Sequence, residues 1–208
     1  MRILYIDTSS SYLYASIVSS RKVLCEVKKE FGHSLSEEAL PSIVELFNER
    51  NLKATDIDKI IVVNGPGSFT GIRIGITIAK VFAWSLNIPI TTISALEAMS
   101  LSSKTNMIHV PILDARRGYV FGAIYDQDNN AIFPPKHIKL EELMQVLQDK
   151  ENYIFITNDE FENIENKESY DPDFEKIVNT FESKEQINPH AVNPEYLKLT
   201  EAEESKLN

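Results

Sequence analysis

The chain has 208 residues, of which 43% are apolar, enough for a buried core in one large or two small domains. The formal net charge of −10 comes from the second half, because residues 1–103 contain 10 basic and 10 acidic side chains and residues 104–208 contain 11 and 21. Such a surface repels phosphate backbones, which argues against direct nucleic-acid binding, although it would equally serve solubility.

Further features exclude secreted and membrane classes. The single cysteine, Cys25, cannot form a disulfide framework. The chain opens on a strand pattern and has no signal-peptide apolar region, and no apolar run approaches the length of a membrane span. We therefore expect a cytoplasmic protein with no membrane partner.

The first half alternates between strand and helix patterns. Three short strands separated by tight turns predict an antiparallel meander, at residues 2–7, 12–19 and 23–28. A helix is expected from Ser34 or Ser36 to Arg50, with one apolar side. The β-branched run Ile60–Val63 is typical of a strand buried on both faces.

A glycine-rich turn follows this buried strand and opens a second helix. Gly65, Pro66 and Gly67 form the turn, and Ser68 or Thr70 can cap the helix. Small residues then recur every fourth position and share one helical face, at Gly71, Gly75, Ala79 and Ala83. Each glycine inside a helix costs about 1 kcal/mol relative to alanine, and close approach to another helix usually compensates for this cost. Since the other faces are also apolar, we expect a partner molecule to cover the outer side.

The second half repeats the order of the first. Strands are expected at Met107–Asp114 and Tyr119–Tyr125, and a third follows a turn at residues 128–130. Later elements include two helices, at residues 140–148 and 172–181, and a strand at residues 153–156. The acidic stretch 159–185 predicts a surface loop with weak local order. By analogy, the repeat predicts a duplicated α/β fold of the actin, sugar kinase and Hsp70 type, with an N-terminal lobe at residues 1–103 and a smaller, acidic C-terminal lobe at residues 104–208.

In the actin-like fold a nucleotide lies between the lobes, held near an aspartate at the end of the first strand. Asp7 and Thr8 occupy this place, and Gly65, Gly67 and Ser68 at a helix N-terminus could attract an anion. The alternative, which we favour, is that these residues only complete tight turns, because the first turn lacks the glycine that lets backbone amides enclose a phosphate.

No catalytic group is visible. The four histidines are far apart in sequence, so there is no HxxxH or HExxH metal motif. Cys25 has no histidine or helix N-terminus nearby to lower its pKa, and the serines lack a GxSxG elbow. His109, in an apolar strand, is expected to be a core histidine. We predict no catalytic residue and no metal site in this chain.

Three strings carry a family resemblance: ILYIDTS at residues 3–9, NGPGSFTGIRIG at residues 64–75 and NPEYLKL at residues 193–199. Together they resemble the TsaB family, which belongs to the M22 glycoprotease-like group and to the bacterial tRNA threonylcarbamoyladenosine pathway. The resemblance implies a ribonuclease-H-like duplicated fold with a reduced second lobe. It also implies a non-catalytic protein that binds and activates a TsaD-like catalytic subunit, which would hold ATP and a metal ion, while this chain alone binds no cofactor.

The family's role further implies a TsaE-like ATPase as third component, a homodimer when the chain is alone, and contact with tRNA only through the complex. That complex transfers threonylcarbamoyl from its adenylate to the adenosine next to the anticodon of tRNAs reading codons that begin with A. The catalytic relative's histidine pair matches Ala95 and Met99 here. Carried onto this chain, the helix–helix interface would comprise Leu40, Val44, Phe47, Gly71, Arg73, Gly75, Thr77, Ala79 and Lys80.

Two other functions stay open from the sequence. A standalone phosphotransferase of the actin-like superfamily would bind ATP as a purified chain, and the missing phosphate glycines argue against it. A metallopeptidase, as the older family label suggests, would need a bound metal.

Overall fold

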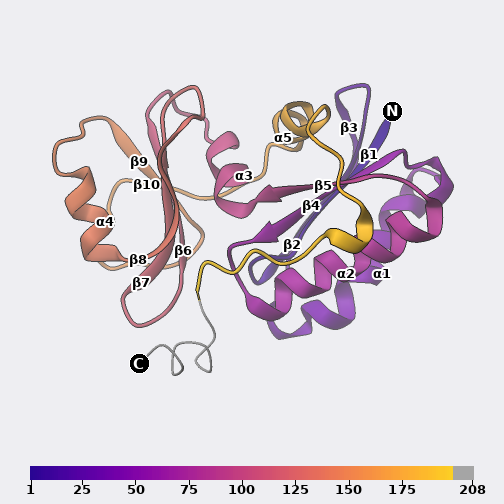
Figure 1. The fold of residues 1–208 in the computed structure, drawn as a ribbon, viewed down its shortest axis with the longest axis horizontal. Coiled ribbons are helices and arrows are strands. Elements are labelled where there is room, and N and C mark those ends of the chain that lie inside the picture. The colour runs from indigo at the N-terminus through magenta and orange to yellow at the C-terminus, as the bar shows by residue number, and fades with distance from the viewer. Residues whose placement is uncertain (199–208) are drawn as a thin grey trace.

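Two five-stranded sheets with the same strand order form the two lobes of the computed structural model, which describes residues 1–198 (Figure 1). The first has the order β3-β2-β1-β4-β5 and the second, read in the same sense, β8-β7-β6-β9-β10. In both sheets the first three strands of this order pair antiparallel with one another. The fourth strand pairs parallel with the third, and the fifth pairs parallel with the fourth. The predicted duplication of an α/β unit is therefore confirmed.

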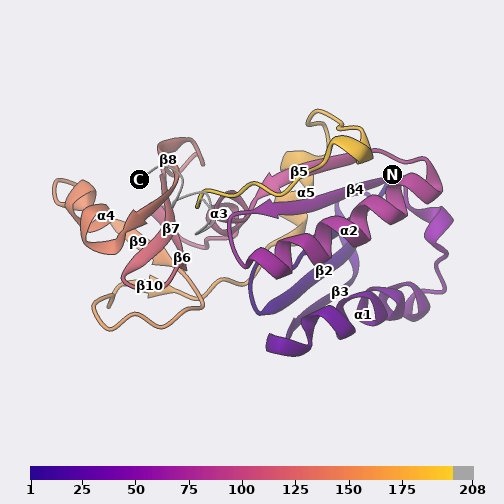
Figure 2. The same ribbon diagram turned by 60° about the horizontal axis from the view of Figure 1, so that its bottom comes forward.

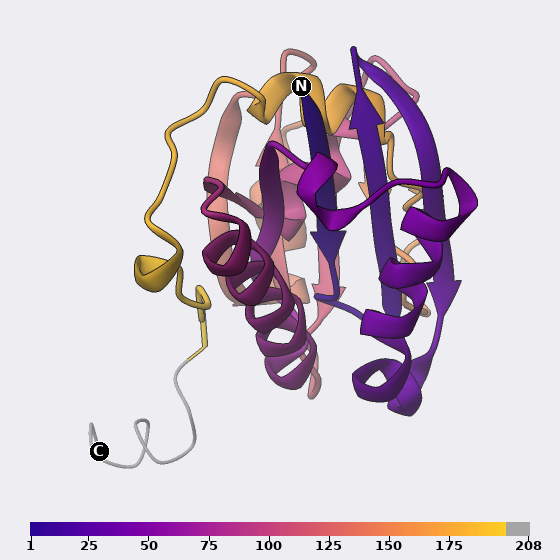
Figure 3. The same cartoon turned by 90° about the vertical axis from the view of Figure 1, so that its right-hand side faces the viewer.

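The central strands of the first sheet are buried on both faces, whereas its edge strand β3 is largely exposed. Its strands are β1 (Arg2–Asp7), β2 (Tyr12–Ser19), β3 (Lys22–Glu30), β4 (Lys59–Gly65) and β5 (Ile90–Ser94). Alternate residues point to opposite faces of a strand, so Ile60 and Val62 of β4 join one core cluster while Ile61 and Val63 join another. Helices α1 (Leu35–Glu49) and α2 (Phe69–Leu86) lie side by side on one face (Figures 2 and 3).

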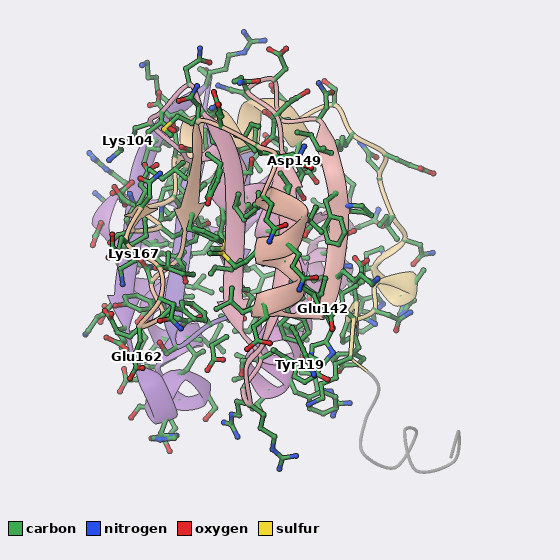
Figure 4. All side chains as sticks on the ribbon, turned by 90° about the vertical axis from the view of Figure 1, so that its left-hand side faces the viewer. Lys104, Tyr119, Glu142, Asp149, Glu162 and Lys167 are labelled. Atoms are coloured by element: carbon green, nitrogen blue, oxygen red, sulfur yellow. The ribbon has the colours of Figure 1, made fainter. Side chains whose placement is uncertain are left out.

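The second lobe is smaller. It consists of β6 (Ile108–Asp114), β7 (Tyr119–Tyr125), β8 (Ala131–Lys139), β9 (Tyr153–Ile156), β10 (Lys167–Glu168) and helix α4 (Leu140–Leu147). Helix α4 packs on the outer face of the sheet, and Figure 4 shows it in front of the strands with Glu142 labelled. The short strands and the single short outer helix make this the reduced lobe expected from the sequence.

The two lobes share one apolar core. Helix α3 (Ala95–Leu101) contacts strands of both sheets, and helix α5 (Phe174–Phe181) contacts the first sheet and α3 (Figure 1). A single buried cluster includes Tyr5 from β1, Met99 from α3 and Phe121 from β7. This cluster joins the two sheets through packed side chains, which limits the movement of the lobes against each other.

The C-terminal part of the chain corrects two expectations. The predicted division between residues 103 and 104 does fall between the sheets, but α5 and the following residues return to the first lobe. Lys59 of β4, fully buried, donates hydrogen bonds to the carbonyls of Phe181, Glu182 and Lys184 at the end of α5. The stretch 159–185 is thus not simply a surface loop, because α5 buries its apolar face in the interlobe core.

One expectation about membrane spans was also wrong. Helix α2 is long and apolar enough to cross a membrane by length and composition. In this fold its small residues are buried against the first sheet, the position of a core helix in a folded domain.

Candidate functional site

A cleft with a volume of about 810 Å³ opens between the lobes. It is bounded by the turn after β1, the N-terminal ends of α1 and α2, and the turn after β6. The polar side chains in its lining are mostly hydroxyls, with one histidine, one arginine and two carboxylates: Ser9, Ser10, Ser11, Ser36, Ser68, Thr70, His33, Arg116, Asp114 and Asp159. This is where a nucleotide would lie in the actin-like fold.

Asp7 and Thr8, predicted as a possible nucleotide site, are turned away from this cleft. Both are buried, and neither contributes to the cleft lining. The Thr8 hydroxyl donates to the Gly71 carbonyl at 2.7 Å, and the Ser9 amide donates to the Asp7 carboxylate at 2.8 Å. Burial raises the pKa of Asp7, although the bonds from Ser9 oppose this shift. The two side chains therefore complete the junction between β1 and α2.

The glycine-rich turn is closed by its neighbours. The Ser68 amide donates to the Ser9 carbonyl at 2.7 Å, and the Ser68 hydroxyl accepts from the Gly71 amide at 3.2 Å. A side chain on Gly67 would overlap the Ser9 backbone, and one on Gly65 would overlap the Glu195 carbonyl. Gly67 and Ser68 do line the cleft, but the Ser68 and Gly71 amides already donate within these turns and are not available to a phosphate.

The small-residue stripe of α2 faces its own sheet, which corrects the predicted interface. A side chain on Gly71 or Gly75 would collide with Thr8 of the same chain, and Ala79 and Ala83 are fully buried. Phe47 of α1 is also buried, with its ring stacked on Phe82 at 6.1 Å. Gly71, Gly75, Ala79 and Phe47 thus provide no surface for a partner.

The outer side of the helix pair is different. Leu40 and Val44 of α1 are each 45% exposed, and Val81 and Trp84 of α2 are 56% and 67% exposed. Arg73 and Thr77 are exposed and Lys80 is half-buried, so these predicted residues do reach the surface. Helix α2 carries Arg73 and Lys80 and no acidic residue, in a protein of net charge −10.

No sequence pattern predicted that the C-terminal segment packs beside α2. The Lys80 ammonium donates to the carbonyls of His190 and Val192 at 3.3 and 3.0 Å, and Arg73 donates through Nε to the Tyr196 hydroxyl at 2.7 Å. The only sequence signal was the NPEYLKL string, which marks the segment but not its place in the fold.

Helix α3 carries apolar core residues at the two positions that the family resemblance led us to examine. Ala95 and Met99 are buried in the interlobe cluster. His109 is buried, 3.1 Å from the Ser100 hydroxyl and 3.2 Å from the Thr105 carbonyl, so it is the satisfied core histidine expected. Within residues 1–198, no group of three or more His, Cys, Asp or Glu side chains could hold a metal ion.

The duplicated lobes around a cleft define a protein of the actin, sugar kinase and Hsp70 class. A family model described as TsaD, tRNA N6-adenosine threonylcarbamoyltransferase, matches residues 27–204. The tRNA threonylcarbamoyladenosine biosynthesis protein TsaB of Bacillus subtilis (strain 168) is 31% identical, covering 98% of this chain and 96% of that protein. The protein of the same name from Escherichia coli (strain K12) is 32% identical, covering 64% of this chain and 58% of its own length. The chain therefore belongs to the TsaD family and, within it, to the TsaB proteins.

Solved structures agree on the fold. YeaZ from Pseudomonas aeruginosa superimposes with a TM-score of 0.77 at 18% identity, covering 94% of this chain and 99% of that one. A second structure, described as an uncharacterized protein with similarity to peptidase YEAZ from the same organism, gives 0.79 at 17% identity, covering 95% and 99%. These likenesses confirm the predicted fold class.

Proposed function

We propose that this chain is a cytoplasmic, non-catalytic subunit of the bacterial complex that transfers threonylcarbamoyl from its adenylate to the adenosine next to the anticodon of tRNAs reading codons that begin with A. It binds and activates a TsaD-like catalytic subunit, which holds ATP and the metal ion. A TsaE-like ATPase completes the complex, and the chain forms a homodimer when alone. The acidic surface keeps tRNA away from this chain, so tRNA is bound only by the complex.

The observation that carries the proposal is the apolar outer side of α1 and α2. Most of the large apolar side chains exposed within the described residues lie on these two helices, including Leu40, Val44, Val81 and Trp84. Exposed apolar side chains gathered on two neighbouring helices favour a protein–protein interface. The partner surface is therefore proposed at Leu40, Val44, Arg73, Thr77 and Lys80, with Val81 and Trp84 added and the buried glycine stripe removed.

Three features support a non-catalytic role. The turn after β4 packs against the turn after β1, and its Ser68 amide donates to the Ser9 carbonyl instead of pointing at a phosphate. The histidine positions of the catalytic relative are filled by Ala95 and Met99. The lobes share a packed core, which opposes the domain closure that a sugar-kinase-like phosphotransferase needs to exclude water. These features also weigh against a standalone phosphotransferase or a metallopeptidase.

The test combines binding and activity. The purified chain is mixed with the TsaD-like and TsaE-like proteins of the same source, ATP, threonylcarbamoyl adenylate and tRNA, and the modified adenosine is measured. We expect modification only when both this chain and the TsaD-like protein are present. Modification by this chain without the TsaD-like protein would contradict the non-catalytic role.

A matched pair of substitutions locates the interface. Val44→Asp places a charge on the outer side of α1, where we expect binding to the TsaD-like protein to weaken by about tenfold or more, because a buried charge lacks a partner. Ile132→Asp makes the same change on β8 of the second lobe, at a side chain of nearly equal exposure, 44% against 45%. Equal binding by both variants would place the interface elsewhere.

A further inference from the structure

The last described residues return to the first lobe and pass along the side of α2 (Figure 3). Val192 is buried in the core cluster under α1 and α2, and the Glu195 amide donates to the Asn64 carbonyl at 2.7 Å. Gly65 makes this approach possible, because a side chain there would overlap Glu195. The segment 188–198 is therefore anchored at several points.

The end of segment 188–198 places the Tyr196 side chain against Arg73, an exposed arginine of α2. The Tyr196 ring stacks on the Phe69 ring with 4.7 Å between centroids and 23° between planes. The Arg73 guanidinium lies 3.9 Å from the Phe69 centroid, and its Nε donates to the Tyr196 hydroxyl. We call Phe69, Arg73 and Tyr196 the aromatic–arginine platform. Phe69 and Tyr196 remain 43% and 40% exposed, so the platform is open to a partner.

The platform continues the apolar outer side of α2. Phe69, Arg73, Thr77 and Val81 are spaced four residues apart, which places them in one row along the helix. All four are exposed. Tyr196 thus extends a surface of α2 with a residue more than a hundred positions away in sequence.

The arginine is held but not neutralised. Among the described residues its one hydrogen-bond partner is Tyr196, through Nε, and it forms no ion pair. The Nη donors of Arg73 therefore remain for an external acceptor, and carboxylates are the acceptors that a guanidinium binds with two parallel bonds. Stacking on Phe69 and the hydrogen bond that Arg73 donates to Tyr196 fix the guanidinium in advance, which lowers the entropy lost on binding.

We propose that the C-terminal segment is part of the docking surface and that Tyr196 positions Arg73 for a carboxylate of the TsaD-like partner. This inference rests on the proposed function. A basic and apolar helix such as α2 complements an acidic and apolar partner surface. A second copy of this chain would present the same basic α2, so the two helices would repel each other. We therefore assign the TsaD-like protein, and not a second copy, to this surface.

The test is a double-mutant cycle on binding to the TsaD-like protein, followed by titration calorimetry. The variants are Tyr196→Ala, Tyr196→Phe, Arg73→Gln and the double variant Arg73→Gln with Tyr196→Ala; Tyr153→Ala, which removes a half-buried tyrosine from the second lobe, is the control. We expect Arg73→Gln and Tyr196→Ala each to weaken binding by about tenfold. Because Tyr196 acts through Arg73, the affinity of the double variant should be no lower than that of the single variant with the lower affinity. Tyr196→Phe keeps the stacking, loses the hydrogen bond and should fall between the wild type and Tyr196→Ala.

Two readouts separate positioning from a general loss of structure. Far-ultraviolet circular dichroism should match the wild type in every variant, and the loss of affinity with added salt should be smaller once Arg73 is replaced. Two results would overturn the inference while leaving the proposed function standing, provided that the wild-type chain binds. In the first, Tyr196→Ala binds with the affinity of the wild type; in the second, the losses of the two single variants add up in the double variant. Failure of the wild-type chain to bind would overturn the proposed function itself, and the inference with it.

Discussion

The side chain of Thr8, the residue directly after β1, occupies the space into which a side chain on Gly75 would project, so α2 packs closely on the end of β1. The Thr8 hydroxyl is also bonded to the Gly71 carbonyl one turn earlier in the helix. The glycines of α2 therefore serve the interior of the first lobe. Their cost in helix propensity is offset by the burial of α2 on its own sheet.

This contact predicts the effect of the smallest possible side chain at Gly75. Gly75→Ala should lower the free energy of unfolding by about 1 to 3 kcal/mol, because the added methyl group must displace Thr8 in a fully packed region. Urea unfolding followed by circular dichroism measures it. Thr77→Ala, on the exposed side of the same helix, is the control and should stay within about 0.5 kcal/mol of the wild type. An increase in stability with Gly75→Ala, as helix propensity alone predicts, would contradict this packing.

Lys59 links the first sheet to the returning helix α5. Lys59→Met keeps the length of the side chain but removes the ammonium, which leaves the carbonyls of Phe181, Glu182 and Lys184 without this donor. We expect a loss of about 1 to 3 kcal/mol in the free energy of unfolding, because three hydrogen bonds from a charged donor are lost and the Phe181 carbonyl keeps only the bond from the Lys184 amide. Lys136→Met, at an exposed lysine of β8, should change little. Equal stabilities of the two variants would mean that the hydrogen bonds of Lys59 make no net contribution to the free energy of unfolding.

Asp7 is a buried carboxyl whose pKa is raised, mainly by burial. A group with a raised pKa in the folded state costs no stability below its unfolded pKa, and the cost grows as the pH rises through the folded pKa. Asp7→Asn keeps the oxygen that accepts from the Ser9 amide and removes the charge. The variant should therefore be more stable than the wild type at neutral pH, with the difference shrinking toward acid pH. Urea unfolding at several pH values measures this, and a constant difference would contradict it.

His109 should give the opposite pH dependence. Burial lowers its pKa, so the folded state resists protonation. Its contribution to stability is present above the unfolded pKa of about 6.5 and is lost as the pH falls through the folded pKa. Between about pH 7.5 and 5.5 the wild type should lose more stability than His109→Gln. Parallel losses in the two proteins would show that the pKa of His109 in the folded state is not lowered.

Much of the fold followed from local patterns. The strands around Ile6, Val62 and Val110 were predictable because β-branched runs bounded by turn residues have few other stable conformations. Their repetition in the second half predicted the duplicated lobes. The position of α5 was not predictable, because the acidic residues around it suggested a solvated loop while its apolar face and the Lys59 ammonium hold it between the lobes.

Part of the candidate site could likewise be predicted from the sequence, and part could not. The absence of a metal motif, the core position of His109 and the tight turn at Gly67 could be inferred from residue types and spacing. The contact between Tyr196 and Arg73 could not, because it joins positions with no shared pattern and depends on the path of the returning chain.

The sequence alone determined that this chain is a duplicated α/β protein of the TsaB type with an apolar second helix, since periodicity and a long specific string are properties of the order of residues. Only the tertiary structure decided which neighbour each side of that helix meets. A four-residue repeat defines a stripe, but either the chain's own sheet or a partner helix can cover it. Thr8, directly after β1, packs against Gly71 and Gly75, and Ala79 and Ala83 are buried in the cluster of the first sheet, so the sheet covers the stripe. The surface left for a partner is consequently the opposite side, where Arg73 meets Tyr196.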